Sequence, residues 1–168
     1  IFFLGLSALT ISCTDQGTSP ADRHFNIRFK YGVTARNELN TFENKFTKDL
    51  ILDGTVTIPF VLSDNDLAAI EGKLTEIDFF TYPDTFIVQT TDTVGYISHH
   101  STFIFKVKSE SIIKTLVWAD AIVAPLGDER PSKLREAIAF IRSIIESKPE
   151  YQRLPAARVR NLRCQWNM

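Results

Sequence analysis

Regular alternation of apolar and polar side chains recurs along this chain, and it limits the possible fold more than any other feature. The apolar members of the first alternating segment are Phe25, Ile27, Phe29 and Tyr31. The same period of two runs through residues 102–108 and 111–118, with Ser109-Glu110 between them. Successive side chains of a strand point to opposite faces, so each segment has one buried and one solvated face. The pattern predicts a half-buried sheet that contains a hairpin.

Further strands are expected at residues 41–47, 56–62 and 86–90. In the first of these, Phe42 and Phe46 are expected to share one face, with a turn at residues 35–38 before it. Asp53-Gly54 is a turn signal. Pro59 has no backbone N–H to donate, which predicts that its strand lies at a sheet edge or carries a bulge.

Two amphipathic helices are predicted. Ser63 followed by Asp66 is typical of a helix start with a capping box, and the helix should run to about Glu76. Calcium binding by the same acidic stretch is the alternative, but the spacing of an EF-hand loop is missing. The second helix is expected to begin at Ser132 and to stop at Pro149. The aromatic pair Phe79-Phe80 is expected in the core, and an exposed binding patch is the alternative.

These elements predict an α+β domain in two layers. Short connections between strands favour an antiparallel sheet, here of about five to six strands, and the two helices must bury their apolar stripes on it. A chain of 168 residues is sufficient for one such domain, which we expect at residues 24–149. Residues 150–168 show no periodicity and are expected to form a basic tail.

The start of the chain resembles a bacterial lipoprotein signal. Residues 1–12 are uncharged and apolar but too short to span a bilayer, which suits the h-region of a signal peptide whose basic n-region is missing. Ile11 and Ser12 precede Cys13 as in a lipobox, although Thr10 departs from the usual leucine. Residues 13–23 are polar and predict a flexible tether. The alternative is a buried segment with Cys13 as an inert core thiol.

The lipoprotein interpretation makes Cys13 the lipidation site. Acyl chains on Cys13 would then anchor the mature chain to a cell membrane, on the extracytoplasmic side of a bacterial envelope. Cys164 would have no cysteine left to pair with, because the chain has only two.

The charge balance gives no reason to expect nucleic-acid binding. The formal net charge is −1, although Glu150 and four arginines give residues 150–168 a charge of +3. That tail is either solvated or a binding segment for an acidic lipid or wall polymer.

Catalytic signatures are missing from the sequence. It contains no nucleophile elbow, zinc-protease motif, P-loop or dinucleotide fingerprint. A nucleophile–base pair would have to use one of the three histidines, His24, His99 and His100. The enzyme hypothesis is an envelope enzyme that uses His99 or His100. Neighbouring residues on an extended backbone point apart, so His99 and His100 are not expected to share a metal ion. We therefore predict no enzyme activity, no cofactor and no metal site.

Several short segments resemble small bacterial lipoproteins of unknown function. They are Tyr31-Gly32-Val33, Asn37-Glu38-Leu39-Asn40-Thr41-Phe42, Lys48-Asp49, Leu62-Ser63, Ile77-Asp78-Phe79-Phe80-Thr81-Tyr82-Pro83 and Leu134-Arg135-Glu136. This resemblance covers most of the chain and implies a membrane-anchored domain, without an activity.

The order of elements around Leu62-Ser63 and Phe79-Phe80-Thr81-Tyr82-Pro83 is also similar to that of emfourin-like inhibitors of thermolysin-type metalloproteases. The resemblance implies a protease partner, with the loop at Asp92–Ser101 as the expected contact. The main hypothesis is a lipid-anchored, non-catalytic binding or accessory domain with an envelope protein as partner. Protease inhibition is its alternative.

Overall fold

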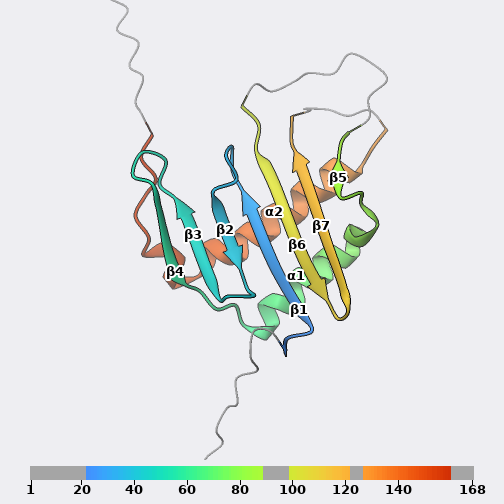
Figure 1. The fold of residues 1–168 in the computed structure, drawn as a ribbon, viewed down its shortest axis with the longest axis horizontal. Coiled ribbons are helices and arrows are strands. Elements are labelled where there is room, and N and C mark those ends of the chain that lie inside the picture. Colours follow the sequence, from blue (N-terminus) through green and yellow to red (C-terminus); the bar gives the residue numbers. More distant parts are fainter. Residues whose placement is uncertain (1–21, 89–98, 122–126, 160–168) are drawn as a thin grey trace, which may run out of the picture.

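The computed structural model describes residues 22–88, 99–121 and 127–159, and these form a two-layer α+β domain (Figure 1). The strands are β1 Phe25–Tyr31, β2 Asn37–Asn40, β3 Lys45–Asp49, β4 Thr55–Pro59, β5 Thr85–Phe86, β6 Thr102–Ser109 and β7 Ile112–Ala119. The helices are α1 Asp64–Glu76, the 3-10 turn η2 Phe79–Thr81, α2 Arg130–Ser147 and the short α3 Pro149–Gln152. The predicted fold class is confirmed.

One sheet contains all seven strands in the order β4-β3-β2-β1-β6-β7-β5. All pairs are antiparallel except β5–β7, so the sheet is mixed. Its strand count is slightly above the five to six expected. The central pair β1–β6 joins segments almost 80 residues apart, with Phe29 opposite Phe105.

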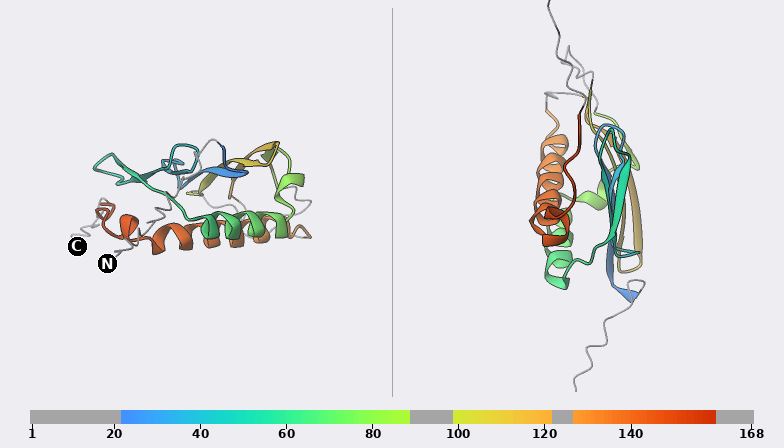
Figure 2. Two further views of the ribbon diagram at one scale, coloured as in Figure 1. Left: turned by 90° about the horizontal axis from the view of Figure 1, so that it is seen from below. Right: turned by 90° about the vertical axis from the view of Figure 1, so that its left-hand side faces the viewer.

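Both long helices pack on the same face of the sheet, which the two side views in Figure 2 show as separate layers. The core lies between the layers and is largely aromatic. Phe105 is fully buried, with its ring centroid 4.7 Å from that of Phe29 and 5.2 Å from that of Phe79. Phe79 is therefore a core residue, as predicted, and Phe80 packs against it edge-on.

The predicted start of α1 is confirmed. Ser63 is the N-cap, its Oγ accepts a hydrogen bond from the backbone N of Asp66, and the Asp66 carboxylate accepts one from the backbone N of Ser63. Lys148, at the end of α2, donates to the same carboxylate at 2.6 Å. The capping box thus also joins the two helices.

The hairpin of β6 and β7 is confirmed, as are the turn at Asp53-Gly54, where Gly54 has a φ of 78°, and the edge position of Pro59 in β4. The predicted strand at 56–62 ends earlier, at Pro59.

The strand expected at 41–47 is correct only for residues 45–47, which belong to β3. Residues 41–44 form a turn, and residues 37–38 of the expected turn belong to β2. Thr41 explains this change. Its buried Oγ1 accepts a hydrogen bond from the backbone N of Ile27 at 2.8 Å, and Thr41 therefore does not join the β2–β3 ladder. Phe46 points into the core, whereas Phe42 is only half-buried and lies outside it.

Two other element boundaries need correction. Of the strand expected at 86–90, only Phe86 pairs, together with Thr85 before it, and residues 89–90 lie outside the described residues. Helix α2 begins at Arg130 and not at Ser132. Pro131 suits the first turn of a helix, and Asp128 Oδ1 accepts from Arg130 N at 3.0 Å.

The folded part continues past residue 149, where we expected a tail. Tyr151 and Leu154 pack against the core, and Arg158 forms a bridge with Ile51 and an ion pair with Asp53. Residues 160–168 lie outside the described residues.

Candidate functional site

The sheet face opposite the helices is the candidate site. No described helix or strand lies over it (Figure 2). The alternation that buries one side of each central strand places the other residues on this open face. Its residues on β1, β2 and β6 are Arg28, Lys30, Glu38, Ile104, Lys106 and Lys108, together with Asn26 and Asn40, which are themselves buried. These include four cations and the carboxylate of Glu38, and Glu43 in the turn after β2 adds a second carboxylate that accepts from Asn40 at 2.9 Å, so positive charges outnumber negative ones at the centre of the open face.

Glu38 partly neutralises this charge. Its carboxylate lies 2.7 Å from Arg28 Nε and 3.3 Å from Lys30 Nζ. Burial alone would raise the pKa of Glu38, but the two cations outweigh it and hold that pKa below its usual value. The hydrogen bond that Arg28 Nε donates to Glu38 raises the pKa of Arg28. The pairing fixes two cationic side chains in place on the sheet.

Lys106 is the exposed cation beside this pair. Its Nζ lies 5.8 Å from the centre of the Phe42 ring, close enough for a cation–π contact. Within the part of the chain that the structure describes, no carboxylate lies within ion-pair distance of Lys106. Lys108 donates to the carbonyl of Arg23 at 3.2 Å. Lys106 therefore keeps a positive charge available to a ligand.

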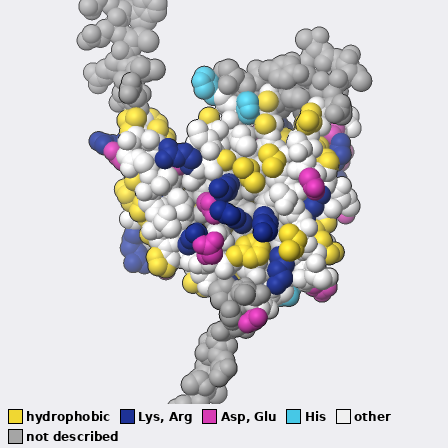
Figure 3. All heavy atoms as spheres, in the orientation of Figure 1, with side chains coloured by type: hydrophobic (Ala, Val, Ile, Leu, Met, Phe, Trp, Pro, Cys, Tyr) yellow, Lys and Arg dark blue, Asp and Glu magenta, His cyan; other side chains and the backbone are white. Residues whose placement is uncertain are grey.

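A hollow of about 270 Å³ opens between these side chains, lined by Arg28, Lys30, Ile104, Phe105, Lys106 and Thr115. Apolar side chains continue next to it on β7, where Ile113 is 63% and Val117 37% exposed. Figure 3 views this side of the molecule and shows dark blue side chains over the middle strands with yellow groups beside them. The open face can attract a negative charge and bury apolar surface around it.

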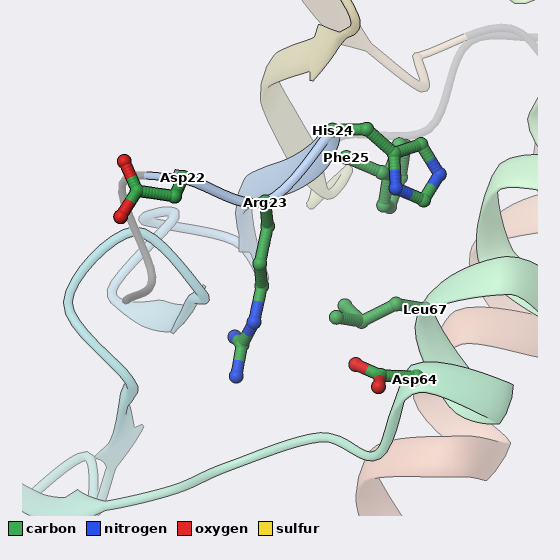
Figure 4. Close-up of a pocket in the computed structure, with 6 residues that line it drawn as sticks. All are labelled: Asp22, Arg23, His24, Phe25, Asp64 and Leu67. Atoms are coloured by element: carbon green, nitrogen blue, oxygen red, sulfur yellow. The ribbon is translucent and has the colours of Figure 1, made fainter. Parts of the chain in front are cut away.

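A second hollow, of about 420 Å³, lies where the chain enters the domain (Figure 4). Its polar groups do not converge on a common point. Arg23 donates to Asn44 at 3.0 Å, His24 pairs with Glu71 at 3.0 Å, and the Asp22 carboxylate points away from Asp64 and Leu67. These contacts hold the start of β1 against the domain, and we assign no ligand to this hollow.

The residues singled out from the sequence are not brought together. Cys13, Cys164 and residues 92–98 of the expected contact loop lie outside the described residues. His24 is far along the sheet from His99 and His100, at the opposite end of β1 and β6. Among the described residues, no three His, Cys, Asp or Glu side chains are grouped to hold a metal ion.

Sequence reasoning did not identify the cationic cluster on the open face. The available signal was that the polar positions of two alternating segments are mostly Lys or Arg. What the sequence alone did not reveal is that these two segments are neighbours in the sheet.

None of the helices in the described ranges is long and apolar enough to cross a bilayer. Comparisons of the chain with protein-family models, with curated proteins and with solved structures give no significant match.

Proposed function

We propose that this chain is a membrane-anchored bacterial lipoprotein whose domain binds an acidic surface of an envelope protein and has no catalytic role. The uncovered, cationic sheet face is the observation that carries the binding part of this proposal. The lipobox-like sequence ending at Cys13 carries the anchoring part.

The chemistry of the open face favours a protein partner over a small ligand. Its hollow of about 270 Å³ is small, whereas charged and apolar groups extend beyond it over several strands. Protein interfaces combine apolar contacts with complementary charge, which steers the partners together. Lys106 supplies the charge and Ile113 and Val117 supply the apolar contacts, so an acidic patch with apolar neighbours is the matching surface.

Anchoring through Cys13 would keep the domain near its partner. Residues 13–23 are a short polar segment that ends where β1 begins. Two or more acyl chains hold a protein stably at a membrane, whereas one chain binds only weakly. The tether would therefore raise the effective concentration of the open face at the envelope.

Site-specific photo-crosslinking on intact cells tests the binding surface. A photoreactive amino acid is placed at Thr115 on the open face or, as the control, at the exposed Ala139 on the outer side of α2. We expect one discrete protein adduct from Thr115 and none from Ala139. An adduct from Ala139 alone, or no specific adduct at Thr115, would contradict the proposed surface.

A matched pair of charge reversals tests the electrostatic part. Lys106→Glu changes the open face, and Lys133→Glu makes the same change of net charge on α2. Because a like charge at an interface opposes binding, Lys106→Glu should lower the adduct yield roughly tenfold while Lys133→Glu leaves it unchanged. Equal effects of the two variants would refute a role for the open face.

A further inference from the structure

A third hollow lies on the helix side of the sheet and differs from the open face in shape and chemistry. It has a volume of about 520 Å³. Its lining includes Tyr31 at the end of β1, Lys48 on β3, Arg142 on α2, Tyr151 on α3 and the apolar Val33 and Ile51. Asp49 also lines it, but the carboxylate of Asp49 is already engaged, because it accepts from the backbone N of Ile51 at 3.0 Å and lies 3.7 Å from Arg36. We call it the tyrosine pocket.

Each tyrosine ring of the tyrosine pocket carries a cation on its face. The guanidinium carbon of Arg142 lies 5.4 Å from the centre of the Tyr31 ring, and Lys48 Nζ lies 4.7 Å from the centre of the Tyr151 ring. Arg142 also pairs with Glu146 at 2.9 Å. Lys48 has no carboxylate within ion-pair distance among the described residues. Two cations thus line the hollow against the single carboxylate of Asp49, and Lys48 lacks an anionic partner among the described residues.

The two tyrosine hydroxyls are neutral hydrogen-bond donors at physiological pH. Burial raises the pKa of Tyr31, which is only 6% exposed, and burial also raises the pKa of Tyr151. A neutral phenol donates a hydrogen bond to an anion without repelling it. The hydroxyls and the two cations therefore favour the same kind of ligand.

The core holds both rings in place. Tyr31 stacks on Phe29 with ring centroids 5.0 Å apart, and Tyr151 packs edge-on against Phe46 at 5.5 Å. The backbone N of Arg158 donates to the carbonyl of Leu50 at 3.2 Å, which fastens the segment after α3 beside the pocket. A site whose groups are already fixed loses little conformational entropy on binding.

The geometry points to a binding site for a small organic anion, a carboxylate with an apolar body. The carboxylate would lie between Lys48 and Arg142, and the apolar part would lie against Val33 and Ile51, which are 60% and 48% exposed. This inference concerns a site separate from the open face and stands without the proposed function.

Calorimetric titration of the purified full chain tests the inference, with titration into buffer as the blank. The probes are 4-phenylbutyrate and the uncharged 4-phenylbutyramide, which share the same apolar body and differ in the head group, a carboxylate against a neutral amide. Because charge-assisted hydrogen bonds are stronger than neutral ones, the acid should bind at least roughly tenfold more tightly than the amide. Equal affinities, or no binding of the acid up to about 10 mM, would overturn the proposal.

Substitutions then locate the site. Lys48→Met and Arg142→Gln should each weaken binding of the acid at least roughly fivefold. Lys45→Met is the control, because Lys45 lies on the same strand but on the open face. An equal loss in Lys45→Met and Lys48→Met would refute the assignment. If a variant fails to fold, the comparison of acid and amide on the unaltered chain still decides.

Discussion

Replacing Asp66 with alanine should cost the domain considerably more stability than the same replacement of Asp64 in the first turn of α1. The Asp66 side chain is largely buried. Its carboxylate accepts one hydrogen bond from the backbone N of Ser63 at 3.0 Å and another from Lys148 Nζ at 2.6 Å. Asp66→Ala removes both contacts, so it loosens the start of α1 and its link to the end of α2 together.

The expected size follows from these two contacts. Loss of half of a capping box costs about 0.5–1 kcal/mol, and loss of a partly buried charged hydrogen bond costs about 1–1.5 kcal/mol. Together they lower the free energy of unfolding by about 2 kcal/mol. For a domain of this size that is a fall of about 4–8 °C in Tm. Asp64→Ala is the matched control, because exposed Asp64 is in the same turn and contributes about 0.3–1 kcal/mol through the helix dipole.

The assay is thermal unfolding followed by circular dichroism at several pH values. Burial by itself would raise the pKa of Asp66, but Lys148 and Ser63 more than offset this, so the pKa lies below its usual value. A lowered pKa in the folded state stabilises the fold above the unfolded pKa of about 4, and this stability is lost as the pH falls further. The Tm difference between the unaltered chain and Asp66→Ala should therefore be complete at pH 7 and shrink below about pH 4.

Two results would refute this reasoning. One is an Asp66→Ala variant that loses no more stability than Asp64→Ala. The other is a Tm difference that stays constant down to pH 2, about two units below the ordinary carboxyl pKa.

Three further outcomes are expected. Phe79→Ala should lower the free energy of unfolding by about 3–5 kcal/mol in denaturant titration, because Phe79 is fully buried. Phe80 is only partly buried, so Phe80→Ala should cost clearly less, and equal costs would contradict this difference. Burial raises the pKa of Tyr82 to about 12, so the stability that the neutral Tyr82 hydroxyl contributes is complete below pH 10 and is lost as the pH rises towards 12. Tyr82→Phe should therefore lose less stability than the unaltered chain over that range. An equal fall of Tm with pH in both proteins would contradict this. If the chain is instead an emfourin-like inhibitor, adding it at micromolar concentration to a thermolysin-type protease should abolish the activity of that protease. The proposed envelope-binding function predicts no inhibition.

Features that depend on neighbouring residues could be predicted from the sequence. The capping box needs only Ser63 and Asp66, and the β6–β7 hairpin needs two alternating segments with a tight turn between them. Both were predicted at nearly the correct residues. The buried position of Phe79 followed from its place directly after an amphipathic helix.

Features that depend on distant partners could not be predicted. Strand β2 has little apolar alternation and exists because β1 and β3 pair with it on both sides. Strand β5 pairs through only two residues and runs parallel to β7, which no local pattern indicates. The cationic cluster has the same origin, because Arg28 and Lys106 face each other only once β1 and β6 pair. Likewise, the tyrosine pocket joins Tyr31 to Arg142 and Tyr151, which are more than 100 residues away in the sequence.

Intact-mass analysis of the membrane fraction tests the central claim most directly, because the proposed envelope location of the open face depends on anchoring through Cys13. The chain is expressed in a bacterium with a start methionine and basic residues placed before Ile1, beside a Cys13→Ala variant. The account predicts a mass equal to residues 13–168 plus acyl chains, and predicts that Cys13→Ala loses this species. An unmodified chain that keeps residues 1–12 would contradict it.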